Sequence, residues 1–118
     1  MITGTVDRDR VPVVTLPVAG GVWSAAIDTG FNGDLELPES MRSLVSARYH
    51  GEAKSELAGG QIVLEDLYRV EFPFDGQTIS ADATFAPTKQ ILIGTNLLQK
   101  YHLDIHFPNR TVLLERVA

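Results

Sequence analysis

A single carboxylate in a turn is the feature of this sequence with the clearest chemical potential. The apolar run Ala25-Ala26-Ile27 ends at Asp28, and Thr29 and Gly30 follow directly. Thr29 supplies a hydroxyl, and Gly30 supplies a flexible backbone with an unobstructed N–H. A carboxylate at the end of an apolar strand is costly unless it is paired or used in chemistry. We interpret Asp28 as half of a catalytic pair of carboxylates, the other half coming from a second copy of the chain.

The same tripeptide also suits an ordinary turn, because Asp, Thr and Gly all favour turns. Its context favours the catalytic interpretation. A second apolar strand, Ile91-Leu92-Ile93, also ends in a glycine, Gly94, and leads into Thr95-Asn96. Between these two strands lies a hairpin signal at Gly59-Gly60. We expect Ile93 to Asn96 to support the turn that carries Asp28.

Composition places the chain among globular proteins and excludes several classes. At 118 residues with a hydrophobic fraction of 44%, residues 1–118 are predicted to form a single domain with its own core. The net charge of −5 and scattered basic residues argue against a nucleic-acid partner. No run approaches the ~18 apolar residues that a membrane helix needs, so no membrane partner is expected.

The chain contains no cysteine, which excludes disulfides, thiol nucleophiles and thiolate metal sites. The N-terminus carries no basic start or apolar segment typical of a signal peptide. Together these observations predict a cytoplasmic protein that needs no cofactor.

The elements that must position Asp28 are mainly short strands. Alternating or apolar runs bounded by turn residues predict about eight or nine strands, most of them antiparallel, because the linkers are too short for crossover helices. Pro38 opens a predicted helix that continues to about Tyr49 on an i, i+3, i+4 apolar pattern. Residues 96–101 are predicted to add one or two helical turns after Thr95.

Two strands, 55–58 and 61–64, flank Gly59-Gly60. Two glycines between alternating runs suit a two-residue hairpin turn with positive φ angles. We therefore expect a hairpin whose tip comprises Ala58, Gly59, Gly60 and Gln61.

Taken together, these segments resemble the retropepsin-like (clan AA) aspartic proteases. Residues 26–30 are similar to the signature of two hydrophobic residues followed by Asp-Thr-Gly, and Ile91 to Leu98 is similar to a later apolar-Gly segment of that family. The hairpin at Gly59-Gly60 stands where the family has its flap. Phe31-Asn32-Gly33 and the helix predicted at Pro38 resemble the small prokaryotic members.

The resemblance implies a mostly β, closed acid-protease barrel with two short helices and one half-site per chain. It implies a homodimeric aspartic endopeptidase in which Asp28, Thr29 and Gly30 form the catalytic turn. The flap and the neighbouring Phe31 and Asn32 would contact an extended peptide substrate. No metal is implied.

The sequence departs from the retroviral pattern beside the catalytic turn. An acid and an arginine of the retroviral members correspond here to Asn32 and Thr95, and a neutral hydrogen bond between these two side chains could replace the ion pair. The last strand, 111–117, follows a tight turn and could pair within its own subunit. These departures leave open a catalytically inactive module that binds a peptide or a partner protein.

Two further patterns have simpler interpretations. Gly59-Gly60-Gln61 matches the catalytic tripeptide of peptide-release factors, but the chain lacks their basic surface, so a hairpin turn is favoured. His102 and His106 lie on a predicted strand together with Asp104, and no third metal ligand is evident. We expect Asp104 to be solvated or to cap an element.

Overall fold

The computed structural model describes residues 1–117, and nearly all of its regular structure is β-strand. The strands are β1 (Ile2–Val6), β2 (Pro12–Val18), β3 (Gly21–Ile27), β4 (Leu35–Pro38), β5 (Arg48–Glu56), β6 (Ile62–Phe74), β7 (Gln77–Ala86), β8 (Ile91–Ile93), β9 (Tyr101–His106) and β10 (Thr111–Arg116). One 3₁₀ helix, η1 (Glu39–Met41), is the only helical element in this part of the chain.

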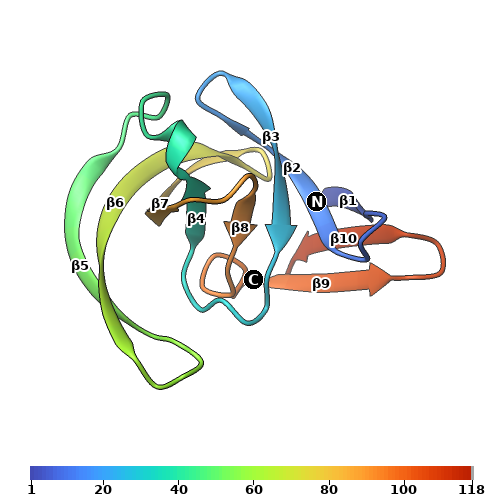
Figure 1. Cartoon of the computed structure of the whole chain (residues 1–118). Helices are drawn as coiled ribbons and strands as arrows, with labels where there is room; N and C mark the ends of the chain where they lie inside the picture. The colour runs from blue at the N-terminus through green and yellow to red at the C-terminus, as the bar shows by residue number, and fades with distance from the viewer. Residues whose placement is uncertain (118) are drawn as a thin grey trace.

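All ten strands belong to one strongly curled sheet, in the order β5-β6-β7-β4-β8-β3-β2-β1-β10-β9. Most neighbours are antiparallel, as predicted, and the two parallel pairs are β3–β8 and β4–β7. Figure 1 shows the long β5–β6 hairpin arching around one side of the short central strands, while the β9–β10 hairpin projects on the other. The sheet curls far enough for β6 to pack against β2.

The core fills the inside of this curl and follows the alternation of the strands. Alternate residues of β2, β6 and β7 point inward, because successive side chains of a strand face opposite sides of the sheet. Val14, Leu16, Val70 and Phe72 are buried in this way. The short strands β4 and β8 bring further fully buried side chains into the centre, among them Leu37 and Ile93. The loop that follows β3 therefore begins at the buried centre of the sheet, where Ile27 pairs with Ile93.

Both helix predictions are wrong in extent. The chain after Pro38 forms only η1 and a following turn, in which Leu44 and Val45 both donate their N–H to the Met41 carbonyl. Met41 is buried but Leu44 is 56% exposed, so the apolar pattern does not form a buried face. Residues 95–100 form consecutive turns closed by hydrogen bonds from Leu98 to Thr95 and from Tyr101 to Leu98. Helices this short are marginal without an extensive packed face.

The hairpin between β5 and β6 forms where it was predicted, but its turn differs. Glu56 pairs with Ile62, and Leu57 donates its N–H to the Gln61 carbonyl at 2.8 Å. The loop therefore has three residues, and only Gly60 in it has a positive φ, of 81°. A three-residue loop with its last residue in the left-handed region is a common alternative to the two-residue turn.

Candidate active site

Asp28 follows β3 directly and is held by two backbone hydrogen bonds and one to its side chain. Its N–H donates to the Ile93 carbonyl at 3.0 Å, and its own carbonyl accepts the Phe31 N–H at 3.1 Å. One carboxylate oxygen, Oδ1, accepts the Gly30 N–H at 2.9 Å. Asp28 is half-buried, whereas Thr29 and Gly30 are exposed. The turn therefore fixes the carboxylate while leaving the threonine hydroxyl accessible.

The loop after this turn is joined to the segment that follows β8. The N–H of Gly94 donates to the Asp34 carbonyl, that of Thr95 to the Phe31 carbonyl, and that of Asn96 to the Gly33 carbonyl, at 2.8–3.1 Å. Ile93 to Asn96 thus lie against Asp28 and the loop that follows it.

Phe31 packs over the two glycines of this junction. A Cβ atom added to Gly33 or to Gly94 would come within 2.8 Å of the Phe31 ring. A methyl group at Gly33 would displace the Phe31 ring, and one at Gly94 would also meet the Gly33 backbone. The ring therefore occupies the space that these two glycines leave open, close in sequence to the Asp28 turn.

Asp34 connects the loop to a third element, β7. Its Oδ1 accepts a hydrogen bond from Asn96 Nδ2 at 2.7 Å, and its Oδ2 accepts the Asp82 N–H at 3.0 Å. Sequence reasoning singled out Asn96 but missed Asp34. The signal that could have identified it is an acid placed between a glycine and the alternating strand Leu35-Glu36-Leu37.

The predicted hydrogen bond between Asn32 and Thr95 is wrong. Thr95 Oγ1 donates instead to the Phe31 carbonyl at 3.3 Å. Asn32 is exposed, and its side chain forms no hydrogen bond within residues 1–117. The polar pair beside the site is Asp34 with Asn96.

A cavity of about 730 Å³ lies between this loop and the β5–β6 hairpin. From the loop side it is lined by Gly30, Phe31 and Asn32, and from the hairpin side by residues that include Leu57 and Ala58. Of the predicted site residues, Gly30, Phe31, Asn32, Ala58 and Asn96 border this cavity. Asp28, Thr29, Gly59, Gly60, Gln61 and Ile93 to Thr95 are not part of its lining.

Sequence reasoning also missed the charged groups that line the cavity. Besides Asp34 in the loop, acidic side chains line it from β4, β5, β6 and β7, and one basic side chain, Lys54, joins them from β5. Partial burial raises the pKa of Glu36 above its ordinary value, and the neighbouring carboxylates of Glu65 and Asp28 add to the rise. Asp28 is therefore close enough to the cavity for its charge to act on Glu36.

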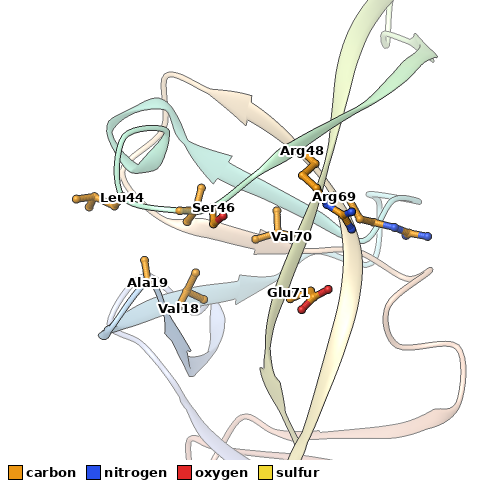
Figure 2. Close-up of a pocket in the computed structure, with 9 residues that line it drawn as sticks. Val18, Ala19, Leu44, Ser46, Arg48, Arg69, Val70 and Glu71 are labelled. Carbon is orange, nitrogen blue, oxygen red and sulfur yellow. The ribbon is translucent and has the colours of Figure 1, made fainter.

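A second cavity, of about 390 Å³, lies near the opposite end of β6 (Figure 2). Its wall combines apolar side chains, among them Val18 and Val70, with the charged Arg48, Arg69 and Glu71. Arg69 also forms an ion pair with Asp82 at 3.2 Å. None of the predicted site residues lines this cavity.

Within residues 1–117, no three His, Asp or Glu side chains are grouped so that they could hold a metal ion. The same residues contain no helix of the length and apolar character needed to cross a membrane.

Two solved viral protein structures have a fold similar to that of this chain. The foamy viral protease–reverse transcriptase in complex with an RNA/DNA hybrid matches with a TM-score of 0.61 at 19% identity, covering 81% of this chain and 13% of that chain. The EIAV protease complexed with the inhibitor HBY-793 also matches with a TM-score of 0.61, at 18% identity, covering 79% of this chain and 89% of that chain.

The fold is retropepsin-like. The fold class predicted from the sequence is thus confirmed, with fewer helical residues than expected. At identities below 20%, the similarity concerns the retropepsin-like fold alone. No family model matches the chain, and no curated protein matches it.

Proposed function

We propose that this chain is an aspartic endopeptidase that works as a homodimer. The observation that carries the proposal is the position of Asp28 on a retropepsin-like fold. Its half-buried carboxylate is fixed by the Gly30 N–H at 2.9 Å, beside a cavity covered by the β5–β6 hairpin. The retroviral proteases of similar structure support the same activity.

In this proposal, Asp28 of each copy supplies one carboxylate of the pair. Two carboxylates about 3 Å apart cannot both ionise easily, so they share one proton. The ionised carboxylate takes a proton from a water that attacks the scissile carbonyl carbon, and the protonated carboxyl donates its proton to the carbonyl oxygen, which gives a neutral diol. As the C–N bond breaks, the carboxyl that took the water proton donates it to the leaving amine, and the other carboxylate recovers a proton from a diol hydroxyl. The exposed Thr29 hydroxyl would contact the second copy and hold the two turns together.

The cavity beneath the hairpin would bind the substrate as an extended peptide. A peptide strand can add its main-chain hydrogen bonds to those of the surrounding strands, while pockets receive alternate side chains. Phe31, Asn32 and Ala58 line the cavity and would contact the peptide. The hairpin tip, including Gly59, Gly60 and Gln61, would move to admit the substrate and exclude water.

We further propose that the chain is of the small prokaryotic type of retropepsin-like proteases. Phe31-Asn32-Gly33 supports this assignment, because the segment lengthens the loop beside Asp28 and moves the acid to Asp34. We also propose a cytoplasmic location, because the chain contains no cysteine.

The test is the Asp28→Asn variant, which keeps the size and shape of the side chain. We expect peptide cleavage to fall at least about a thousandfold, as when a catalytic group is removed. Circular dichroism and sedimentation should show an unchanged fold and mass. Asp66→Asn, at an exposed position of β6, is the matched control and should cleave normally. Undiminished cleavage by Asp28→Asn would overturn the proposal.

A peptide-binding module without catalysis is the second candidate. The observation that favours it is that Phe31 and Asn32 line the cavity, whereas Asp28 and Thr29 do not. Peptide binding without cleavage, together with carboxylates of the two Asp28 residues out of hydrogen-bond reach in a dimer, would support this candidate.

A further inference from the structure

The second cavity, near the start of β5, combines an apolar wall with charged side chains. Its volume is about 390 Å³, and small-molecule sites in proteins have volumes of about 300–1,000 Å³. Figure 2 shows Leu44 on one side of Val70 and the arginines Arg48 and Arg69 on the other. No residue of this wall lines the cavity beside the candidate active site, so the second cavity is a separate feature of the molecule.

The charged part of the cavity contains two arginines that lie directly opposite each other. Arg48 of β5 pairs with Arg69 of β6, and the Cβ atoms of residues paired in this way are about 4.5–5.5 Å apart. Like charges in this position destabilise a pair of strands. Arg69 is compensated by its ion pair with Asp82, at 3.2 Å. Arg48 forms no hydrogen bond or ion pair within residues 1–117, so its charge has no partner there.

The two guanidinium groups have donors available for an anion. A guanidinium carries five N–H donors in a planar fork, and Arg69 uses one of its nitrogens, Nη1, for Asp82. The fork matches the geometry of a carboxylate and forms paired hydrogen bonds with it. A carboxylate bound between Arg48 and Arg69 would also reduce the repulsion between their charges.

Glu71 limits the charge that such an anion can carry. Its carboxylate lines the same cavity, two residues along β6 from Arg69, and residues two apart in a strand lie on the same face. Within the part of the chain that the structure describes, Glu71 forms no ion pair. It therefore repels a dianion such as phosphate more strongly than it repels a monoanion. The wall favours a ligand with a single negative charge.

The apolar part of the cavity can receive a hydrocarbon group. Val18 and Val70 are buried, whereas Leu44, which follows η1, is 56% exposed. A ligand with an apolar body would cover Leu44 and remove its side chain from water, which is favourable. The cavity thus offers apolar contact close to a cationic group.

We propose that this cavity binds a small monocarboxylate with an apolar body, whose carboxylate lies between Arg48 and Arg69 and whose hydrocarbon part covers Leu44. A free acid has this chemistry, and so does the carboxyl terminus of a peptide that ends in an apolar residue. The proposal does not depend on the proposed function, because it uses neither Asp28 nor a second copy of the chain.

The test is an NMR titration of the isotope-labelled chain with N-acetyl-leucine, which carries one carboxylate on an apolar body. Saturable shifts are expected for the amides of residues 44–48 and 69–71. N-acetyl-leucinamide, which has no charge, and inorganic phosphate, which has no apolar body, should each bind about tenfold or more weakly. The absence of saturable shifts with N-acetyl-leucine, or equally tight binding of the amide or of phosphate, would overturn the proposal.

Two variants at exposed positions test the two halves of the cavity. Arg48→Gln removes the charge that has no partner and should weaken the binding of N-acetyl-leucine about tenfold or more. Leu44→Ser should weaken it severalfold. Arg8→Gln, in the exposed turn between β1 and β2, is the matched control and should bind as the wild type does. A well-dispersed amide spectrum shows that each variant is folded, and unchanged affinity in Arg48→Gln would overturn the proposal.

A tetrapeptide of three glycines and a C-terminal leucine distinguishes the two sources of the carboxylate. Tighter binding of this peptide than of N-acetyl-leucine would identify a peptide terminus as the ligand, and tighter binding of N-acetyl-leucine would identify a free acid. Because the shifts are read at residues 44–48 and 69–71, binding of the peptide beside Asp28 is recorded separately.

Discussion

Gly94 lies so close to Gly33 that a Cβ atom on Gly94 would be 2.1 Å from the Gly33 carbonyl oxygen. This approach allows the backbone N–H groups of Gly94, Thr95 and Asn96 to reach the carbonyls of the site loop. Gly94, directly after β8, must be a glycine because its backbone and that of Gly33 approach so closely. The hydrogen bonds that this approach permits hold the loop that follows Asp28.

We predict that Gly94→Ala destabilises the protein by more than about 2 kcal/mol, because the backbone of the site loop must move to accept the methyl group. Urea unfolding followed by circular dichroism measures the change. Gly21→Ala is the control, since its Cβ would meet its nearest neighbour, Trp23, at an ordinary 3.5 Å. Equal stability of Gly94→Ala and the wild type would show that the two segments can separate without cost.

Asp34 is predicted to stabilise the same loop through its side chain. Asp34→Ala removes the acceptor of the Asn96 amide and of the Asp82 N–H, and the loss of hydrogen bonds to a charged group costs about 1.5–3 kcal/mol. Thermal unfolding should show the decrease. Asn32→Ala, in the same loop, is the matched control, because the Asn32 side chain forms no hydrogen bond within residues 1–117. A decrease as large in Asn32→Ala would contradict this role of Asp34.

The sequence predicted much of this arrangement, because the strands and turns depend on local patterns. The strand that ends at Asp28, the hairpin near Gly59 and the apolar strand before Gly94 all follow from alternation and turn residues. The hydrogen-bond partner of the Thr95 side chain could not be predicted in this way. Whether Thr95 reaches Asn32 or the Phe31 carbonyl depends on how the loop after Asp28 folds back, which local propensity does not determine.

Alternation also failed to predict exposure along β6. Ile62 and Leu64 share a parity with the buried Val70 and Phe72, yet they are 67% and 61% exposed. The hairpin extends beyond the core, so its outer face has nothing to pack against within residues 1–117. Burial at one end of a long strand therefore does not imply burial at the other.

The hairpin tip is predicted to depend on Gly60 and not on Gly59. Gly60 has a φ of 81°, which a residue with a side chain adopts at a cost of about 1–2 kcal/mol. Gly60→Ala should therefore destabilise the hairpin and increase amide hydrogen exchange in residues 56–62. Gly59→Ala serves as the control, because its φ is not positive and no atom lies within 4 Å of the added Cβ. Equal exchange in the two variants would contradict the three-residue turn.

The last prediction concerns the pH dependence caused by Glu36. Its pKa is raised above the ordinary value of 4.5 by partial burial and by the carboxylates of Glu65 and Asp28. The folded protein therefore binds this proton more tightly than the unfolded chain does, and the resulting stabilisation, complete below about pH 4.5, is lost as the pH rises through the raised pKa. Glu36→Gln avoids this loss, so its stability relative to wild type should increase with pH from about 4.5 and then level off.

Thermal unfolding between pH 4 and pH 8 measures the difference. We expect it to reach no more than about 1 kcal/mol, because Glu36 is partly exposed and solvent screens its neighbours. Glu52→Gln, at an exposed position of β5, should show no such increase. In an Asp28→Asn background the increase should be smaller, since one of the two neighbouring charges is gone. A difference between Glu36→Gln and wild type that stays constant with pH would contradict the electrostatic contact between Glu36 and the site.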